Sequence, residues 1–200
     1  MSQQLKHMLS DRQLVDLVLG GDMHAFSSLV ESTEGLVAQI VYKLIPHEED
    51  RKDIAQDIYL KVYQHLKNFR FQSRLSTWVG QIAYNTCFNH LQKKQLNVYH
   101  PPEREAEEQE EDIRSTIFRA TDETDRKLLQ KELKGLLQSE IGRLPPLYQT
   151  LIGLYHQEDL SYQELARITG LPEGTVKSYL FRARRQLKDS ILSNYKKEKL

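Results

Sequence analysis

Residues 161–188 read SYQELARITGLPEGTVKSYLFRARRQLK and carry the clearest structural pattern of the chain. Ser161 and Glu164 have the spacing of a capping box, in which each side chain accepts a hydrogen bond from the other residue's backbone N–H. Gly170 then supplies a tight turn, and Pro172 suits the first turn of a second helix because its missing N–H needs no partner there. The segment therefore predicts a helix-turn-helix.

The second helix of this motif is predicted to be basic on its exposed side. At 100° per residue, Val176, Leu180, Ala183 and Leu187 share the buried stripe, and residues 177–188 contain no acidic side chain. A cationic helix of this kind is typical of major-groove binding, although a merely solvated helix is the alternative. The candidate DNA-binding residues are Ser161, Thr175, Lys177, Ser178, Phe181, Arg182, Arg184 and Arg185.

Charge is segregated along the 200 residues, although 28 basic and 28 acidic groups cancel overall. Residues 1–100 carry a net charge of +1, residues 101–126 carry −6 and residues 127–200 carry +5. Such blocks indicate separate working surfaces. The single cysteine is typical of a reducing compartment, and the start of the chain has no signal-peptide pattern, so we expect a soluble, cytoplasmic protein without membrane insertion.

Helical periodicity dominates, so we expect an all-α fold of two small helical domains joined by an acidic flexible linker. The predicted domains span residues 1–97 and 127–200, with the linker at 98–126. Helices are expected near residues 14–18, 23–30, 35–44, 50–66, 75–94 and 129–141, before the helix-turn-helix.

A second candidate surface lies on the helix expected at residues 50–66. Its apolar positions face inward, and the opposite side holds Asp53, Gln56, Asp57 and Leu60. An exposed leucine among carboxylates favours a cationic partner that covers it, but an ordinary surface helix fits equally well.

Residues 67–94 contain five basic residues and no acidic one, with aromatic residues between them. Cations bind phosphates and aromatic rings stack on any base, so this composition is typical of single-strand binding. Phe69 and Phe71 flank the expected loop and are candidates for stacking, whereas Trp78 is expected in the core. On one flank of the next helix, Gln81, Tyr84 and Asn85 are candidates for base contacts.

These segments resemble one family, the extracytoplasmic-function (ECF) sigma factors of bacterial RNA polymerase, which belong to the sigma-70 family. LPPLYQTLIGLYHQEDLS at 144–161, together with the helix-turn-helix, resembles the domain that reads the minus-thirty-five promoter element. DRKDIAQDIYLKVYQHLKNFR at 50–70 and LSTWVGQIAYNTCFNHLQKK at 75–94 resemble the polymerase-docking and promoter-melting domain.

The resemblance implies a role for each surface. Asp53, Gln56, Asp57 and Leu60 would dock on the clamp helices of the polymerase's largest subunit. The loop at 69–76 and the helix after it would capture an unpaired minus-ten base, through Phe69, Phe71, Ser73, Arg74, Ser76, Gln81, Tyr84, Asn85 and Asn89. The implied protein is a sigma factor for promoter-specific initiation in a stress response, without catalysis or cofactor. Its implied partners are core RNA polymerase (clamp helices and flap), promoter DNA and an anti-sigma factor.

The sequence departs from the family pattern at a few of these positions. Gln81 and Tyr84 stand where the melting helix carries arginines, and Tyr179 and Phe181 stand where an arginine and a histidine are common in the recognition helix. These changes bear on the promoter sequence that is read.

Other function classes find less support. HEEDR at 47–51 lacks the second histidine of a zinc motif, and Cys87 with His90 is a single pair of possible ligands, so we expect neither a metal site nor an enzyme. A helix-turn-helix transcription regulator, or a sigma-like protein that binds polymerase without opening promoters, remains the alternative.

Overall fold

The computed structural model describes residues 10–94 and 135–197, and neither range contains a β-strand. The all-α prediction is confirmed. The first range comprises α1 (Asp11–Leu19), α2 (Met23–Leu44), α3 (Glu48–His65), the 3₁₀ helix η2 (Leu66–Asn68) and α4 (Leu75–Lys93). The second comprises a helical stretch at 135–142, α6 (Pro146–His156), α7 (Tyr162–Thr169) and α8 (Glu173–Lys197). The linker predicted at 98–126 lies outside the described residues, as does the start of the helix expected at 129–141.

Side-chain caps define where the first two helices begin. Ser10 accepts a hydrogen bond from the N–H of Gln13 and forms a capping box with it at the start of α1. Asp22 accepts from the N–H groups of His24 and Ala25 at 2.8 and 3.2 Å, and so begins α2. These bonds satisfy amides that the helix itself leaves unpaired.

The two helices predicted at 23–30 and 35–44 are one continuous helix, α2, so the predicted break was wrong. The polar residues between them do not interrupt the helix, because the hydroxyls of Ser32 and Thr33 each donate back to the carbonyl of Leu29 at 2.8 Å. Gly35 lies within α2 and faces Glu158, just after α6, with Oε1 3.6 Å from where a Cβ would be. A distance of 3.6 Å is an ordinary contact, and Gly35 does not end a helix.

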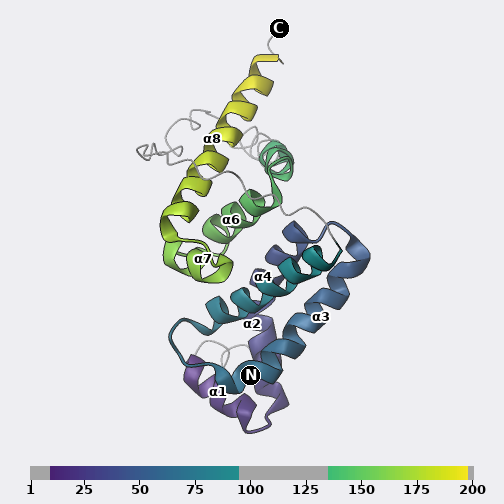
Figure 1. Cartoon of the computed structure of the whole chain (residues 1–200), viewed down its shortest axis with the longest axis vertical. Coiled ribbons are helices and arrows are strands. Elements are labelled where there is room, and N and C mark those ends of the chain that lie inside the picture. The colour runs from purple at the N-terminus through teal and green to yellow at the C-terminus, as the bar shows by residue number, and fades with distance from the viewer. Residues whose placement is uncertain (1–9, 95–134, 198–200) are drawn as a thin grey trace, which may run out of the picture.

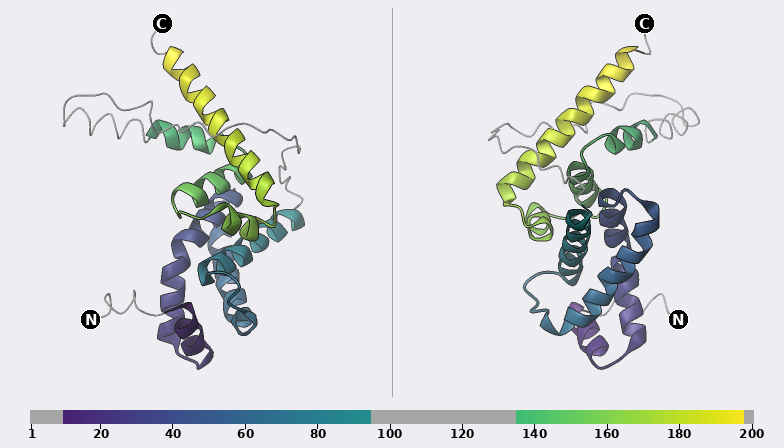
Figure 2. Two further views of the ribbon diagram at one scale, coloured as in Figure 1. Left: turned by 90° about the vertical axis from the view of Figure 1, so that its left-hand side faces the viewer. Right: turned by 45° about the vertical axis from the view of Figure 1, so that its right-hand side comes forward.

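The two parts of the chain share one apolar core and pack against each other. Figures 1 and 2 show α6 and α7 between α8 and the N-terminal helices, with α6 against α2 and α7 against α4. Glycines permit the close approach: a Cβ at Gly80 of α4 would lie 3.0 Å from Ile168 Cδ1, and one at Gly153 of α6 would lie 2.9 Å from Gln39 Cδ. We call this packing of α6 and α7 on α2 and α4 the closed arrangement.

Among the helices of the described ranges, none is both long and apolar enough to cross a lipid bilayer.

Candidate nucleic-acid interface

The helix-turn-helix predicted at 161–188 is confirmed in its geometry. Ser161 N donates to Glu164 Oε2 at 2.9 Å, and Glu164 N donates to Ser161 Oγ at 3.3 Å, which completes the capping box. Gly170 ends α7 in the left-handed conformation, with φ of 73°, and its N–H donates to the carbonyl of Ala166 at 2.9 Å. Glycine adopts this conformation without the steric cost that a Cβ would add.

The buried stripe of α8 is also confirmed, since Val176, Leu180 and Ala183 are fully buried and Leu187 is 8% exposed. Tyr179, which was not among the residues predicted for the stripe, is buried as well and packs against Tyr148 of α6, with ring centroids 5.6 Å apart. Its position beside the stripe on the helical wheel was the available signal.

The predicted cationic residues are spread along the outer side of α8, but several are engaged by neighbouring side chains. Lys177 pairs with Glu173 at 3.0 Å, and the Arg184 guanidinium lies 4.9 Å from the centre of the Tyr155 ring. Thr175, Ser178, Phe181 and Arg182 are half-buried, whereas Ser161, Lys177 and Arg185 are exposed.

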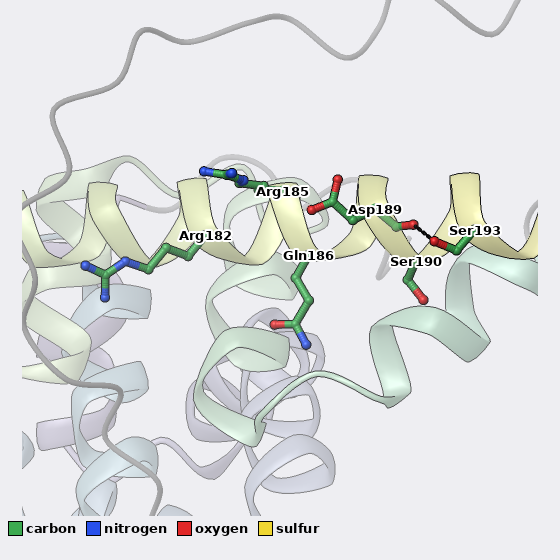
Figure 3. Close-up of a pocket in the computed structure, with 6 residues that line it drawn as sticks. All are labelled: Arg182, Arg185, Gln186, Asp189, Ser190 and Ser193. Atoms are coloured by element: carbon green, nitrogen blue, oxygen red, sulfur yellow. Dashed lines mark hydrogen bonds between the residues drawn. The ribbon is translucent and has the colours of Figure 1, made fainter.

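Further along α8, a shallow open hollow combines cationic, amide, carboxylate and hydroxyl groups (Figure 3). Its residues are Arg182, Arg185, Gln186, Asp189, Ser190 and Ser193. Behind it, Ser190 Oγ donates to Glu140, a buried carboxylate that Arg143 also pairs with at 2.6 Å. The helical stretch at 135–142 is thereby fixed to α8.

The predicted polymerase-docking residues lie together on the outer face of α3. Asp53, Gln56 and Asp57 are exposed, and the Leu60 side chain beside them is 55% exposed. Asp57 pairs with Lys61, one turn later, at 2.6 Å. The inward face is buried at Ile54, Ile58, Val62 and Leu66, as the sequence predicts.

The segment at residues 69–74 links η2 to α4, and its two aromatic rings pack together. Phe69 is only 8% exposed, because it packs between Phe71 and Trp78 with ring centroids 4.7 and 5.2 Å away. Phe71 is 41% exposed and has φ of 55°, a left-handed conformation that is costly for a residue with a large side chain. Of the two predicted stacking rings, Phe71 is therefore the one that reaches the surface.

The remaining predicted minus-ten residues differ in exposure. Gln81, Asn85 and Asn89 line an exposed edge of α4, Arg74 is exposed, and Ser73 and Ser76 are half-buried. Tyr84 is buried, and burial raises the pKa of its hydroxyl to about 12, with Cys87 and Tyr179 of α8 nearby. In the closed arrangement its ring is therefore covered.

The helix-turn-helix contacts both the 69–74 segment and the first turn of α4 directly. Thr77 Oγ1 donates to Glu164 Oε1 at 3.4 Å, the Arg74 guanidinium lies 3.7 Å from the same oxygen, and Arg167 donates to the carbonyl of Gln72 at 2.9 Å. Burial raises the pKa of Glu164, but hydrogen bonds from Ser161 and the nearby Arg74 charge outweigh it, so the pKa is lowered overall. Ile168 of α7 also packs against Gly80 of α4.

Within residues 10–94 and 135–197, no group of three or more histidine, cysteine or acidic side chains is placed to hold a metal ion. Cys87 is fully buried, and burial raises the pKa of its thiol to about 12. A buried thiol of this kind packs as a small apolar residue.

Both halves of the chain match known families. Residues 29–96 match the family described as Sigma-70 region 2, and residues 134–187 match Sigma-70, region 4. The ECF RNA polymerase sigma-E factor of Haemophilus influenzae is 33% identical over 189 residues, which cover 94% of this chain and 98% of that protein. The RNA polymerase sigma-H factor of Pseudomonas aeruginosa is 32% identical over 176 residues, covering 87% and 90%.

Two solved structures share the fold. CnrH, in complex with the cytosolic domain of CnrY, superimposes with a TM-score of 0.59 at 21% identity and covers 92% of this chain and 97% of its own. The sigma factor RpoE of Bartonella quintana, in complex with the anti-sigma factor NepR, has a TM-score of 0.55 at 19% identity, with 82% and 93% covered.

Proposed function

This chain belongs to the ECF sigma factors of the sigma-70 family and is a promoter-specific RNA polymerase sigma factor, and we propose that its three described surfaces divide the work of initiation. The observation that carries the proposal is a capped helix-turn-helix in the same chain as a separate helical bundle with an exposed acidic face and an exposed aromatic loop. No bond is made or broken on this chain, because the polymerase supplies the catalysis.

The outer face of α3 docks on the clamp helices of the polymerase's largest subunit. Asp53, Asp57 and Leu60 present carboxylates around an exposed apolar side chain. A cationic partner surface with an apolar centre would cover all three, and burial of Leu60 would contribute to binding. The flap of the polymerase is the expected partner of the C-terminal domain.

The outer side of α8 reads duplex DNA at the minus-thirty-five element. Lys177, Arg182 and Arg185 lie on one helix that fits the major groove, where they can contact phosphates and base edges. The 69–74 segment and the exposed edge of α4 bind the minus-ten element, with Phe71 stacking on an unpaired base. Because both DNA-binding surfaces lie on one chain, binding at one promoter element raises the effective concentration of the other surface at its own element.

The closed arrangement must open before both elements are read. Elements named for positions 10 and 35 lie about 25 base pairs apart, or about 85 Å of duplex. In the closed arrangement Arg167 of the helix-turn-helix is hydrogen-bonded to the 69–74 segment itself. We therefore assign the closed arrangement to the chain without polymerase. After opening, the predicted linker at 98–126 sets the distance between the two DNA-binding surfaces.

A sequestering anti-sigma factor is the further partner that we propose. RpoE of Bartonella quintana was solved with the anti-sigma factor NepR, and CnrH with the cytosolic domain of CnrY. The division into domains at 1–97 and 127–200, and a cytoplasmic location, belong to the same proposal.

The test is selection of DNA by the complex. The chain is mixed with core RNA polymerase, co-elution is measured by size exclusion, and bound DNA is recovered from a random-sequence pool and sequenced. We expect co-elution and two short motifs at a fixed spacing. A single motif bound by the chain without polymerase would favour the helix-turn-helix regulator, and co-elution without strand opening would favour the sigma-like alternative.

A further inference from the structure

The first two residues of α1 contact Phe71 of the 69–74 segment and Leu75, which directly follows that segment. Asp11 Oδ2 accepts a hydrogen bond of 2.7 Å from the N–H of Leu75, the first residue of α4, although 64 positions separate the two residues. The guanidinium of Arg12, the next residue, lies 5.3 Å from the centre of the Phe71 ring. One end of α1 therefore reaches both the aromatic tip of the segment and the start of the helix that follows it.

The contact at Leu75 replaces a cap that α4 does not provide for itself. Arg74, the N-cap residue, makes no side-chain hydrogen bond to the helix, and the first turn of α4 contains no acidic residue. The first N–H groups of a helix lack internal partners, and the positive end of its dipole favours a carboxylate. Asp11 supplies both the acceptor and the negative charge from a distant part of the chain.

The contact at Phe71 supports a strained backbone. A left-handed conformation at a phenylalanine persists only where the surrounding structure holds it, and φ at Phe71 is 55°. The Phe71 ring packs on Phe69 on one side, at 4.7 Å, and Arg12 lies against it as well. A cation near an aromatic face is attracted to the ring electrons. Arg12 therefore helps to fix the one ring of the segment that is exposed.

Asp11 is itself held in place. It is the first residue of α1, and the capping box of Ser10 and Gln13 closes the turn around it, with Ser10 N donating to Gln13 Oε1 at 2.9 Å. Further along the helix, Val15 and Val18 are buried in the core. A carboxylate carried on such an anchored turn can hold the α4 amide in one position.

We infer that Asp11 and Arg12 are positioning residues for strand opening: Asp11 caps α4 across the fold and Arg12 holds Phe71, so that the 69–74 segment is already shaped to receive an unpaired base. This inference rests on the proposed function, because the shape of the segment matters to DNA only if the segment captures a base. Preorganisation reduces the ordering cost of binding, so its loss slows capture and leaves docking intact.

The experiment compares Asp11→Ala, Asp11→Asn and Asp16→Ala in the full chain bound to core polymerase, on a template from the selection above. Asp16 is a matched control, because it is exposed on the same helix. The rate of strand opening is followed by permanganate reactivity of thymines. We expect Asp11→Ala to slow opening by about 2- to 30-fold, which is the stability cost of losing a side-chain helix cap converted to a rate. Asparagine caps as well as aspartate, so Asp11→Asn should restore most of the rate, and Asp16→Ala should match the wild type.

Two further measurements separate a positioning role from a general one. Co-elution with polymerase and binding of the fully duplex minus-thirty-five element should be unchanged in all three variants. Equal opening rates for Asp11→Ala and the wild type would overturn the inference, and so would a decrease of co-elution in step with opening. If Asp11→Ala does not fold, Arg12→Ala decides the matter: it should slow opening, and a wild-type rate would overturn the inference. A wild-type chain that opens no template refutes the proposed function instead.

Discussion

Replacing Gly80 with leucine should open the closed arrangement. A Cβ at position 80 would lie 3.0 Å from Ile168 Cδ1 and 3.2 Å from Leu36 Cδ2. Ordinary contacts between carbon atoms are about 3.5–4.0 Å, so overlap begins before the rest of the leucine side chain is added. Ile168 belongs to the helix-turn-helix, and separation of α7 from α4 removes this overlap.

The change in the ratio of open to closed chains depends on which of these overlaps is relieved when the arrangement opens. Overpacking of this kind costs about 1–3 kcal/mol. The better helix propensity of leucine and the crowding against Leu36 affect the open and closed arrangements alike, so they cancel. The steric overlap with Ile168 exists only in the closed arrangement. Its free-energy cost should therefore raise the ratio of open to closed chains by about 5- to 150-fold.

Cys87 provides the assay. It lies two turns after Gly80 on the same side of α4, and Tyr179 of α8 lies near its neighbour Tyr84. Burial raises the pKa of its thiol to about 12, so little reactive thiolate is present in the closed chain near neutral pH. The rate at which a thiol reagent labels Cys87 should rise in Gly80→Leu by the same factor as the open population.

Gly142→Leu is the matched control, because no atom lies within 4 Å of a Cβ at that position. It should label at the wild-type rate. Circular dichroism checks that each variant is folded, and if Gly80→Leu is not, Ile168→Ala weakens the same contact from the other side. If a folded Gly80→Leu chain is labelled at the wild-type rate, overlap between position 80 and Ile168 does not open the closed arrangement.

Three other outcomes are expected. The double variant Lys177→Ala, Arg185→Ala should bind the minus-thirty-five duplex more weakly. The slope of its affinity against salt concentration should fall by about 2, one for each phosphate that is no longer neutralised. An unchanged slope in a salt titration would contradict phosphate binding by these residues. Asp57→Arg should abolish co-elution with polymerase while duplex DNA binding persists, and normal co-elution would exclude α3 as the docking face. The lowered pKa of Glu164 means that its charge stabilises the fold above the ordinary carboxyl range and that this contribution disappears as pH falls through the lowered pKa. Glu164→Gln should therefore be less stable than the wild type at pH 7, and the difference should vanish in acid; a constant difference in urea unfolding would argue against the effect.

Local patterns in the sequence were sufficient for the helix-turn-helix and for the helix faces. The Ser161–Glu164 spacing, the left-handed Gly170 and the buried stripe through Leu180 each depend on residues within a few positions of one another. The same is true of α3, whose inward and outward faces follow helical periodicity. Such features depend on the helix propensity and the apolar pattern of a single segment, and both can be read from its residues.

Contacts between distant segments were not predictable in this way. Asp11 looks like an ordinary first-turn acid of α1, and only the fold brings it to Leu75. Gly80 and Gly153 carry no signal of the segments that pack on them, and the helix boundary predicted between residues 30 and 35 was wrong. Tyr84 and Tyr179, two residues that depart from the family pattern, are both buried, and Tyr179 of α8 is near enough to affect the pKa of Tyr84. Their placement depends on the packing of the two halves.

Run-off transcription measures most directly whether this chain starts transcription at a promoter. Core polymerase, the chain and a linear template from the selection are incubated with nucleotides, and the RNA is sized. We expect a transcript of one defined length that is absent with core polymerase alone and with the Asp57→Arg chain. If the chain binds core polymerase and the template but no defined transcript forms, the assignment of promoter opening to this protein is wrong.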